Sequence, residues 1–386
     1  MKKNVRTVNN KSEEACVMRF AALIVMVLLA LPVNLFAGGD TDRCKTKYPI
    51  FLAHGMGGTD EMLGFFDYWY GIEEALQKEG AVVYTSKVNC MDNTEQKALQ
   101  VRKNILECLA ITGAKKVHYI GHSHGTIYGR YAISLLMKND NPDDPGASVP
   151  LSSVIASYTS VSGVHRGSSG PDCIVELCKM ADNVFKLPGG TSEITLGKFV
   201  DFVYGNIIGD NSPHGAENCY ALMTDNVIKN FNREVRDASG VYYQSYVSRI
   251  KWLGPSHAGF TVLWPMIKSR EGDNDGCVSV RSATWPVVYA DNGLPATYGM
   301  DKSVKIYYGP NNEYFYYKGQ ADLTANPIPL DAKKVHFIDS AAWASGVDHL
   351  NIIGHFFGIT PGFDAPAMFV DMVAGLKDLE VSGDII

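Results

Sequence analysis

A serine between two glycines is the side chain of this sequence best suited to nucleophilic chemistry. Gly121-His-Ser-His-Gly125 follows an apolar, β-rich run, and a helix-compatible run begins just after Ser123. A strand that turns sharply into a helix exposes a serine hydroxyl at the apex, and the glycines let the two backbones approach without Cβ clashes. The alternative is a serine in an ordinary turn. The pattern occurs once in the chain, and in this context it predicts Ser123 as a nucleophile.

A nucleophilic serine needs a histidine base and a carboxylate that orients the base. An acidic loop after a late strand-like run offers Asp273 and Asp275, and the alternative for this loop is a surface Asp-Gly turn. Three histidines follow the loop. His336 lies in a strand-like run where a core position is expected, and His355 lies among apolar residues where packing is expected. His349 stands in a loop before an apolar helical start, which leaves it accessible as a base.

A glycine-rich loop, His54-Gly-Met-Gly-Gly-Thr59, follows the apolar strand expected over residues 47–53. In a serine hydrolase of this kind, one N–H of such a loop pairs with the N–H of the residue after the nucleophile to stabilise an oxyanion. The two donors would be the main-chain N–H groups of Met56 and His124. The alternatives are a plain turn or a phosphate-binding loop, but the loop lacks a Lys-Ser/Thr ending and does not match Gly-X-Gly-X-X-Gly.

The elements that must position these residues alternate between strand and helix. Hydrophobic periodicity predicts helices over residues 73–79 and 95–109 and further strands over residues 81–88, 154–162 and 241–250. Gly80 and Gly113 lie where the two helices should end. Such alternation is typical of a parallel sheet with crossover helices, so the predicted fold class is α/β.

Four motifs in the first half of the chain resemble the true lipases of Gram-negative bacteria, the secreted triacylglycerol lipases typified by Pseudomonas and Burkholderia enzymes. The motifs lie at residues 48–60, 67–72, 112–117 and 120–125. The similarity covers residues 47–170, including the segment 161–168, and continues in islands at residues 240–245, 274–276 and 348–350. The resemblance implies an α/β-hydrolase with a mostly parallel central sheet and helices on both faces. It also assigns Asp275 as the acid and His349 as the base beside Ser123.

The substrate class implied by this resemblance is a long-chain acylglycerol, bound at a lipid–water interface. The fold fixes the nucleophile chemistry and leaves the leaving group open, so an esterase for short or soluble esters, an acyltransferase or a polyester depolymerase are alternatives. A catalytically silent exported binding protein is the alternative outside enzymes. Such a protein has no need of an intact serine, aspartate, histidine and glycine loop together. No cofactor is expected, and a lipase-specific foldase is a possible partner.

Two segments depart from the remainder of the chain in character. Residues 171–210 contain two amphipathic stretches, and the resemblance implies a lid here; the alternative is a pair of helices that simply cap the sheet. Residues 282–345 form an aromatic-rich segment that reads as inserted β-hairpins, because 74 positions separate Asp275 from His349 where the family has a short connection. Arg166 could be a surface charge, a substrate contact or a structural buttress, and we favour the buttress because a guanidinium can bind several loop carbonyls.

Residues 1–37 are predicted to be a signal peptide, which leaves a hydrolase domain over residues 38–386. Basic residues precede an apolar run, and Ala37-Gly-Gly39 offers a small-residue cleavage point. Met18 is an alternative start, and an uncleaved membrane anchor is the alternative to a leader. The expected location is secreted or periplasmic. The composition is that of a globular protein, with 46% hydrophobic residues, and a net charge of −6 without a Lys/Arg cluster gives no indication of nucleic-acid binding.

The resemblance also implies a structural calcium ion, whose ligands are poorly matched here. The family places an aspartate two residues after the catalytic histidine, and this chain has Asn351 there, with His355 at the later ligand position. No aspartate between Asp237 and Asp273 supplies the second carboxylate. Because a hard cation prefers several oxygen ligands, we expect no metal.

The family's disulfide is similarly unmatched. Cys219 lies near the first position, but Arg281 stands where the second cysteine would fall, and Cys277 is the available substitute. Removing Cys16 with the leader leaves seven of the eight cysteines, so an odd thiol is expected.

Overall fold

The computed structural model describes residues 42–56, 58, 61–62, 66–90, 92–134, 151–173, 222–235, 237–238, 240–284, 304–308, 313–318, 333–338, 345–355, 363–383 and 385. All of them lie in one compact unit, Asp40–Ile386. The expected signal peptide and residues 174–210 of the expected lid region fall outside these ranges. Within these ranges, no helix combines the length and the apolar character needed to cross a membrane.

An eight-stranded sheet with the order β4-β1-β5-β6-β7-β10-β9-β8 forms the centre of this unit. The strands from β4 to β10 run parallel, and β9 and β8 add an antiparallel edge. The strands are β1 (Ile50–Ala53), β4 (Val83–Thr85), β5 (Val117–His122), β6 (Ile155–Val161), β7 (Tyr242–Ser248), β8 (Val304–Tyr308), β9 (Glu313–Lys318) and β10 (Lys333–Ile338). A separate antiparallel pair consists of β2 (Glu61–Met62) and β3 (Phe66–Asp67).

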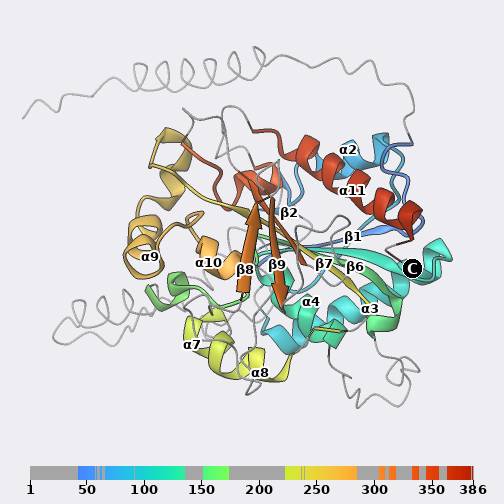
Figure 1. Ribbon diagram of the computed structural model, residues 1–386, viewed down its shortest axis with the longest axis horizontal. Helices are drawn as coiled ribbons and strands as arrows, with labels where there is room; N and C mark the ends of the chain where they lie inside the picture. Colours follow the sequence, from blue (N-terminus) through green and yellow to red (C-terminus); the bar gives the residue numbers. More distant parts are fainter. Residues whose placement is uncertain are drawn as a thin grey trace, which may run out of the picture. The chain divides into compact units, whose positions relative to one another are not determined.

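Helices cover both faces of the sheet (Figure 1). Because successive side chains of a strand point to opposite faces, β1 contributes to two cores. Ile50 and Leu52 pack with α2 (Ile72–Lys78) and α11 (Ala365–Ser382), whereas Phe51 and Ala53 pack with α3 (Thr94–Thr112) and α4 (His124–Ser134). The predicted α/β class, with a mostly parallel sheet and helices on both faces, is confirmed.

Local sequence signals set the ends of these helices. The side chain of Asn93 accepts a hydrogen bond from the N–H of Gln96 and caps the start of α3, and Asp364 caps α11 in the same way. Gly113 follows α3 with a φ of 68°, a left-handed conformation that ends a helix without steric strain. The helix expected over residues 95–109 is therefore longer than expected and ends at the glycine that the sequence indicated.

The aromatic-rich segment adds strands to the central sheet. Strands β8 and β9 form an antiparallel pair, β9 pairs with β10, and β10 lies parallel to β7. His336 of β10 stacks on Tyr246 of β7, with ring centroids 4.2 Å apart, as expected for a histidine in a packed strand. The segment thus lies between the acid loop and His349 in sequence and extends the sheet in space.

Short helical segments occupy the connections. They are η2 (Leu151–Val154), α7 (Thr224–Asn226), the π-helical turn η5 (Val227–Phe231), α8 (Asn232–Glu234), η6 (Pro255–Phe260), α9 (Leu263–Glu271), α10 (Val280–Ala283) and η7 (Asn351–Ile353). Two of them bear on the site: η6 lies between β7 and the acid loop, and η7 directly follows the loop that carries His349.

Candidate active site

Ser123 occupies a sharp turn between β5 and α4. Its φ is 54°, a left-handed value that is uncommon for a non-glycine residue and is found at functional turns. The flanking glycines are required by close backbone contacts: a Cβ at Gly125 would lie 2.3 Å from the carbonyl oxygen of Ala53, and one at Gly121 would lie 2.8 Å from that of Gly125. The strand-to-helix turn predicted from the sequence is therefore present.

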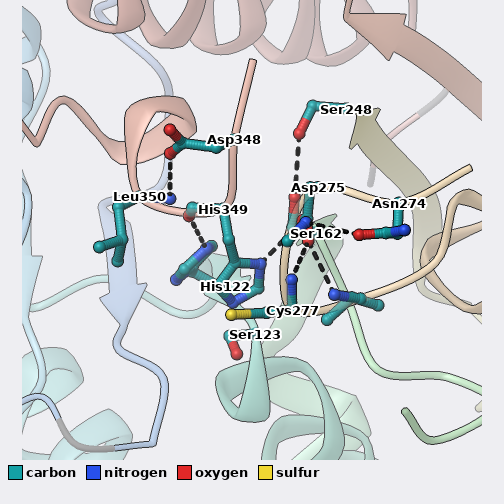
Figure 2. Close-up of polar contacts among 12 residues, drawn as sticks. His122, Ser123, Ser162, Ser248, Asn274, Asp275, Cys277, Asp348, His349 and Leu350 are labelled. Carbon is teal, nitrogen blue, oxygen red and sulfur yellow. Dashed lines mark hydrogen bonds and ion pairs between the residues drawn. The ribbon is translucent and has the colours of Figure 1, made fainter. Parts of the chain in front are cut away.

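The structure brings Asp275 and His349 together. The Nδ1–H of His349 donates to Oδ2 of Asp275 at 2.8 Å, and the main-chain N–H of His349 donates to the carbonyl of Asp275 at 2.9 Å (Figure 2). Oδ1 of Asp275 accepts the N–H groups of Cys277 and Val278 at 3.0 and 2.7 Å. Asp275 is 1% exposed and His349 is 5% exposed. A buried carboxylate thus fixes the ring orientation and leaves Nε2 as the proton acceptor.

The nucleophile and the base come from adjoining segments. The ring of His122, which precedes Ser123, lies 4.6 Å from the ring of His349 between centroids. No hydrogen bond joins the Ser123 hydroxyl to His349 in the described part of the chain. Such bonds are often long in an enzyme without substrate and shorten in the complex.

Two other aspartates near the site, Asp273 and Asp348, bind partners other than His349. Asp273 binds Arg249 at 2.6 Å and Lys268 at 3.1 Å on the surface. Desolvation raises the pKa of Asp273, but the hydrogen bonds from Lys268 and Arg249 outweigh it and lower the pKa. Asp348 faces His257 rather than His349. Asp275 is therefore the carboxylate at the His349 ring among the described residues.

Tyr68 and His122 also belong to the site, and the sequence analysis did not single them out. The hydroxyl of Tyr68 accepts the N–H of Gly55 at 2.8 Å and donates to Nδ1 of His122 at 2.6 Å. Nε2 of His122 must then donate to the carbonyl of His349, 3.0 Å away. Burial, reinforced by His349, lowers the pKa of His122 well below its usual value, so the ring stays neutral and Nδ1 stays an acceptor. The chain of bonds connects the glycine-rich loop to the base.

The two expected oxyanion donors come from the glycine-rich loop and from the start of the helix that follows Ser123. Met56 follows β1 in the glycine-rich loop, and its side chain packs against the cluster that contains Ile127. His124 is the first residue of α4, where main-chain N–H groups have no partner inside the helix. Burial, together with the positive charge of Lys97, lowers the pKa of the His124 ring well below its usual value. His124 would thus contribute its main chain, while its neutral ring packs inside.

Arg166 acts as a buttress, as predicted. Its guanidinium donates to the carbonyls of Arg281 and Thr284 at 2.9 and 2.7 Å. Both carbonyls belong to the segment of α10 that follows the acid loop. Arg166 therefore ties the segment after β6 to the exit of the loop that carries Asp275.

The pairing of Cys277 with Cys219, considered as a substitute for the family's disulfide, is wrong. Its thiol is free, and Cys44, Cys90, Cys108 and Cys173 are free as well, whereas Cys219 lies outside the described residues. Desolvation and the negative charges of Asp275 and Asp348 raise the pKa of Cys277 well above its usual value. The thiol beside the acid is therefore protonated and a poor nucleophile.

Comparisons with known proteins relate the chain to lipases. Residues 49–194 match the family described as lipase (class 2). The chain is similar to a triacylglycerol lipase of Vibrio cholerae, with 39% identity over 159 residues, and to one of Burkholderia plantarii, with 30% identity over 211 residues. These alignments cover 39% and 54% of this chain and 46% and 52% of the two relatives. The chain thus spans about half the length of the curated relatives it matches.

Solved structures agree on the fold. Lipase 1 from Pelosinus fermentans superposes with a TM-score of 0.55 at 18% identity, over 86% of this chain and 99% of that one. The lipase of Staphylococcus hyicus gives a TM-score of 0.51 at 15% identity, over 90% of this chain and 99% of that one. The fold is of the α/β-hydrolase type.

Proposed function

Because residues 49–194 match the family described as lipase (class 2), we propose that the protein is an exported serine hydrolase that cleaves carboxylic esters of lipids. One observation carries the proposal. The buried Asp275–His349 hydrogen bond of 2.8 Å lies beside a serine held at φ 54° on a strand-to-helix turn. This arrangement supports the assignment of a serine nucleophile, its base and the group that orients the base.

The reaction follows from these groups. Ser123 Oγ attacks the ester carbonyl while His349 Nε2 takes its proton, and Asp275 stabilises the imidazolium that forms. The main-chain N–H groups of Met56 and His124 stabilise the tetrahedral oxyanion, at about 3 kcal/mol per donor in comparable enzymes. The imidazolium returns the proton to the departing alcohol, which leaves an acyl-enzyme. Water, deprotonated by His349, then attacks the acyl-enzyme, and the acid departs as Ser123 regains its proton.

Long-chain acylglycerols at a lipid–water interface are the proposed substrates. The similarity to proteins named triacylglycerol lipases supports this class. The basic and apolar pattern of residues 1–37 supports export to the periplasm or medium. A lipase-specific foldase is proposed as a partner on the resemblance to the Gram-negative lipases alone.

A chain-length series of p-nitrophenyl esters, together with emulsified triolein, tests the proposal. We expect kcat/KM to increase toward long acyl chains, triolein to be hydrolysed and Ser123→Ala to abolish both activities. Activity confined to short soluble esters would replace the lipase assignment with an esterase. The absence of hydrolysis, acyl transfer to added alcohol and polyester cleavage in folded wild-type protein would contradict the proposal as a whole.

A further inference from the structure

A second buried Ser–His–Asp arrangement lies beside the first. His257 Nδ1 donates to Oδ2 of Asp348 at 2.7 Å, and His257 Nε2 lies 2.8 Å from the hydroxyl of Ser345. The three residues are 0%, 1% and 5% exposed in that order. The Ser345 hydroxyl has a further contact with Ser256, 3.2 Å away. With every reactive atom enclosed and paired, the arrangement is suited to holding segments together rather than to binding an ester.

The carboxylate of Asp348 is fully used by hydrogen-bond donors. Oδ1 accepts the main-chain N–H of Leu350 at 3.0 Å (Figure 2) and that of Asn351 at 2.7 Å. Oδ2 accepts the side-chain amide of Asn351 at 2.6 Å and the ring of His257 at 2.7 Å. An ionised carboxylate offers about four lone-pair sites, so these four donors saturate it. The charge is satisfied by N–H groups alone, as a buried carboxylate requires.

The residues at this place do not fit a calcium ion. The side chain of Asn351 donates its N–H to Asp348, and Nε2 of His355 donates to the carbonyl of Tyr68 at 3.0 Å. Calcium needs six to eight oxygen ligands, with several carboxylates among them. In the described part of the chain, no cluster of three His, Cys, Asp or Glu side chains could hold a metal. His257 instead comes from the interval between Asp237 and Asp273, which contains no aspartate to supply a second carboxylate.

We infer that His257 is a positioning residue, which holds the catalytic loop by hydrogen bonds in the place where the family uses a cation. The inference rests on the proposed function. His257 lies on η6, before the acid loop, and Asp348 directly precedes His349, so their bond ties the two segments that supply the acid and the base. Main-chain bonds from Lys251 to Ser345 and from Val347 to Arg249, at 2.7 and 2.9 Å, anchor only the residues before Asp348. Asp275 and His122 hold the main chain of His349, and the His257 ring adds a buried side-chain bond to the preceding residue, Asp348.

The chain contains a matched control for this arrangement. His118 is fully buried, its Nε2 lies 2.8 Å from Glu380 Oε1, and its Nδ1 lies 2.8 Å from the hydroxyl of Ser157. This is the same set of groups, but it joins the start of β5 to the end of α11. Loss of His118 should lower stability without moving the catalytic loop.

The test compares His257→Leu, His257→Asn and His118→Leu in the complete chain, at a temperature where circular dichroism shows each variant folded. For p-nitrophenyl butyrate we expect His257→Leu to lower kcat about 10²-fold with KM unchanged, because a small displacement of a catalytic group has an effect of that size. His257→Asn places an amide N–H near the position of Nδ1 and should recover most of the loss. His118→Leu should lower the melting temperature but keep the wild-type kcat. In wild type, calcium and chelator should leave the melting temperature unchanged.

The outcomes separate this inference from the proposed function. If the wild type hydrolyses esters and folded His257→Leu has the same kcat, the positioning role of His257 is overturned while the proposed function stands. A wild-type melting temperature that falls by several degrees on chelation also overturns this role. If His257→Leu does not fold, Ser345→Ala is the deciding variant: the positioning role requires a loss of about tenfold in kcat, and an unchanged kcat contradicts it. A wild type without ester hydrolysis would refute the proposed function. The melting temperatures with calcium and with chelator would still show whether the folded protein binds calcium.

Discussion

At the residue scale, the hydroxyl of Tyr68 is where the glycine-rich loop and the catalytic histidine segment meet. It bonds to the N–H of Gly55 and to the ring of His122, which in turn bonds to the carbonyl of His349. Sequence motifs predicted Ser123, Asp275 and His349 as the catalytic residues, and the structure joins the last two by a hydrogen bond. They could not identify Tyr68, because an aromatic residue in an aromatic run is expected to pack in the core. Only the structure shows that its hydroxyl bonds to the main-chain N–H of Gly55.

Tyr68→Phe tests this connection. The change leaves a buried N–H on Gly55 and the Nδ1 of His122 without their partner, at a cost of about 1–3 kcal/mol each. We expect a lower melting temperature and a kcat reduced by about tenfold or more, since the oxyanion loop and the base lose their common support. Tyr70→Phe is the control, because Tyr70 is 48% exposed. Equal kinetics for the two variants would show that the Tyr68 hydroxyl has no positioning role.

The acid assignment can be tested by two neighbouring aspartates. Asp275→Asn lets the His349 ring adopt the wrong tautomer, which in a comparable triad lowers kcat by about 10⁴. Asp273→Asn disrupts only surface pairs with Arg249 and Lys268, which contribute little. Steady-state kinetics should therefore show a near-total loss in the first variant and near wild-type rates in the second. A near-total loss in Asp273→Asn with near wild-type rates in Asp275→Asn would mean that Asp273, and not Asp275, orients the His349 ring.

At the element scale, the strand-to-helix turn at Ser123 depends on how closely α4 approaches β1. The sequence predicted most strands and helices, but it placed their ends less well: the strand expected over residues 81–88 is limited to Val83–Thr85. It also indicated hairpins in the aromatic-rich segment without indicating that β10 pairs with β7. That pairing joins strands far apart in the chain, and local periodicity contains no information about such partners.

Two glycine substitutions measure the packing of helices on the sheet. At Gly125 a Cβ would lie 2.3 Å from the carbonyl oxygen of Ala53, so Gly125→Ala must push α4 away from β1. At Gly375, inside α11, a Cβ meets nothing within 4 Å. We expect Gly125→Ala to destabilise by about 1–3 kcal/mol through overpacking, and Gly375→Ala to stabilise by roughly 0.5–1 kcal/mol. Urea unfolding measures the free energy of unfolding of each variant. A Gly125→Ala variant as stable as the wild type would contradict the close approach of α4 to β1.

At the scale of the whole molecule, buried neutral histidines make stability depend on pH. Burial lowers the pKa of His122 and His124 well below the usual 6.5, and that of His355 is lowered as well. Below pH 6.5 the unfolded chain binds protons that the folded chain does not, so stability falls as pH falls. The carboxyls with lowered pKa, Glu380 and Asp273, start from 4.5 and 3.8 and act only at lower pH.

Urea unfolding at pH 7.5 and pH 5.5 measures this effect. Each fully buried histidine contributes about 1.4 kcal/mol per pH unit below 6.5, so His122 and His124 together predict a loss of about 3 kcal/mol. Constant or increasing stability on acidification would show that these rings are charged in the folded protein. The hydrogen-bond directions assigned from Tyr68 through His122 to the His349 carbonyl would then be wrong.

Ser123 is the proposed nucleophile, and covalent labelling with a fluorophosphonate probes this role without any assumption about the substrate. Wild-type protein treated with a fluorophosphonate and digested for mass spectrometry should carry one adduct, on the peptide that contains Ser123. Folded Ser123→Ala, with an unchanged melting temperature, should carry none. An adduct on another serine, such as Ser345 of the second buried arrangement, or labelling that persists in Ser123→Ala, would contradict the account.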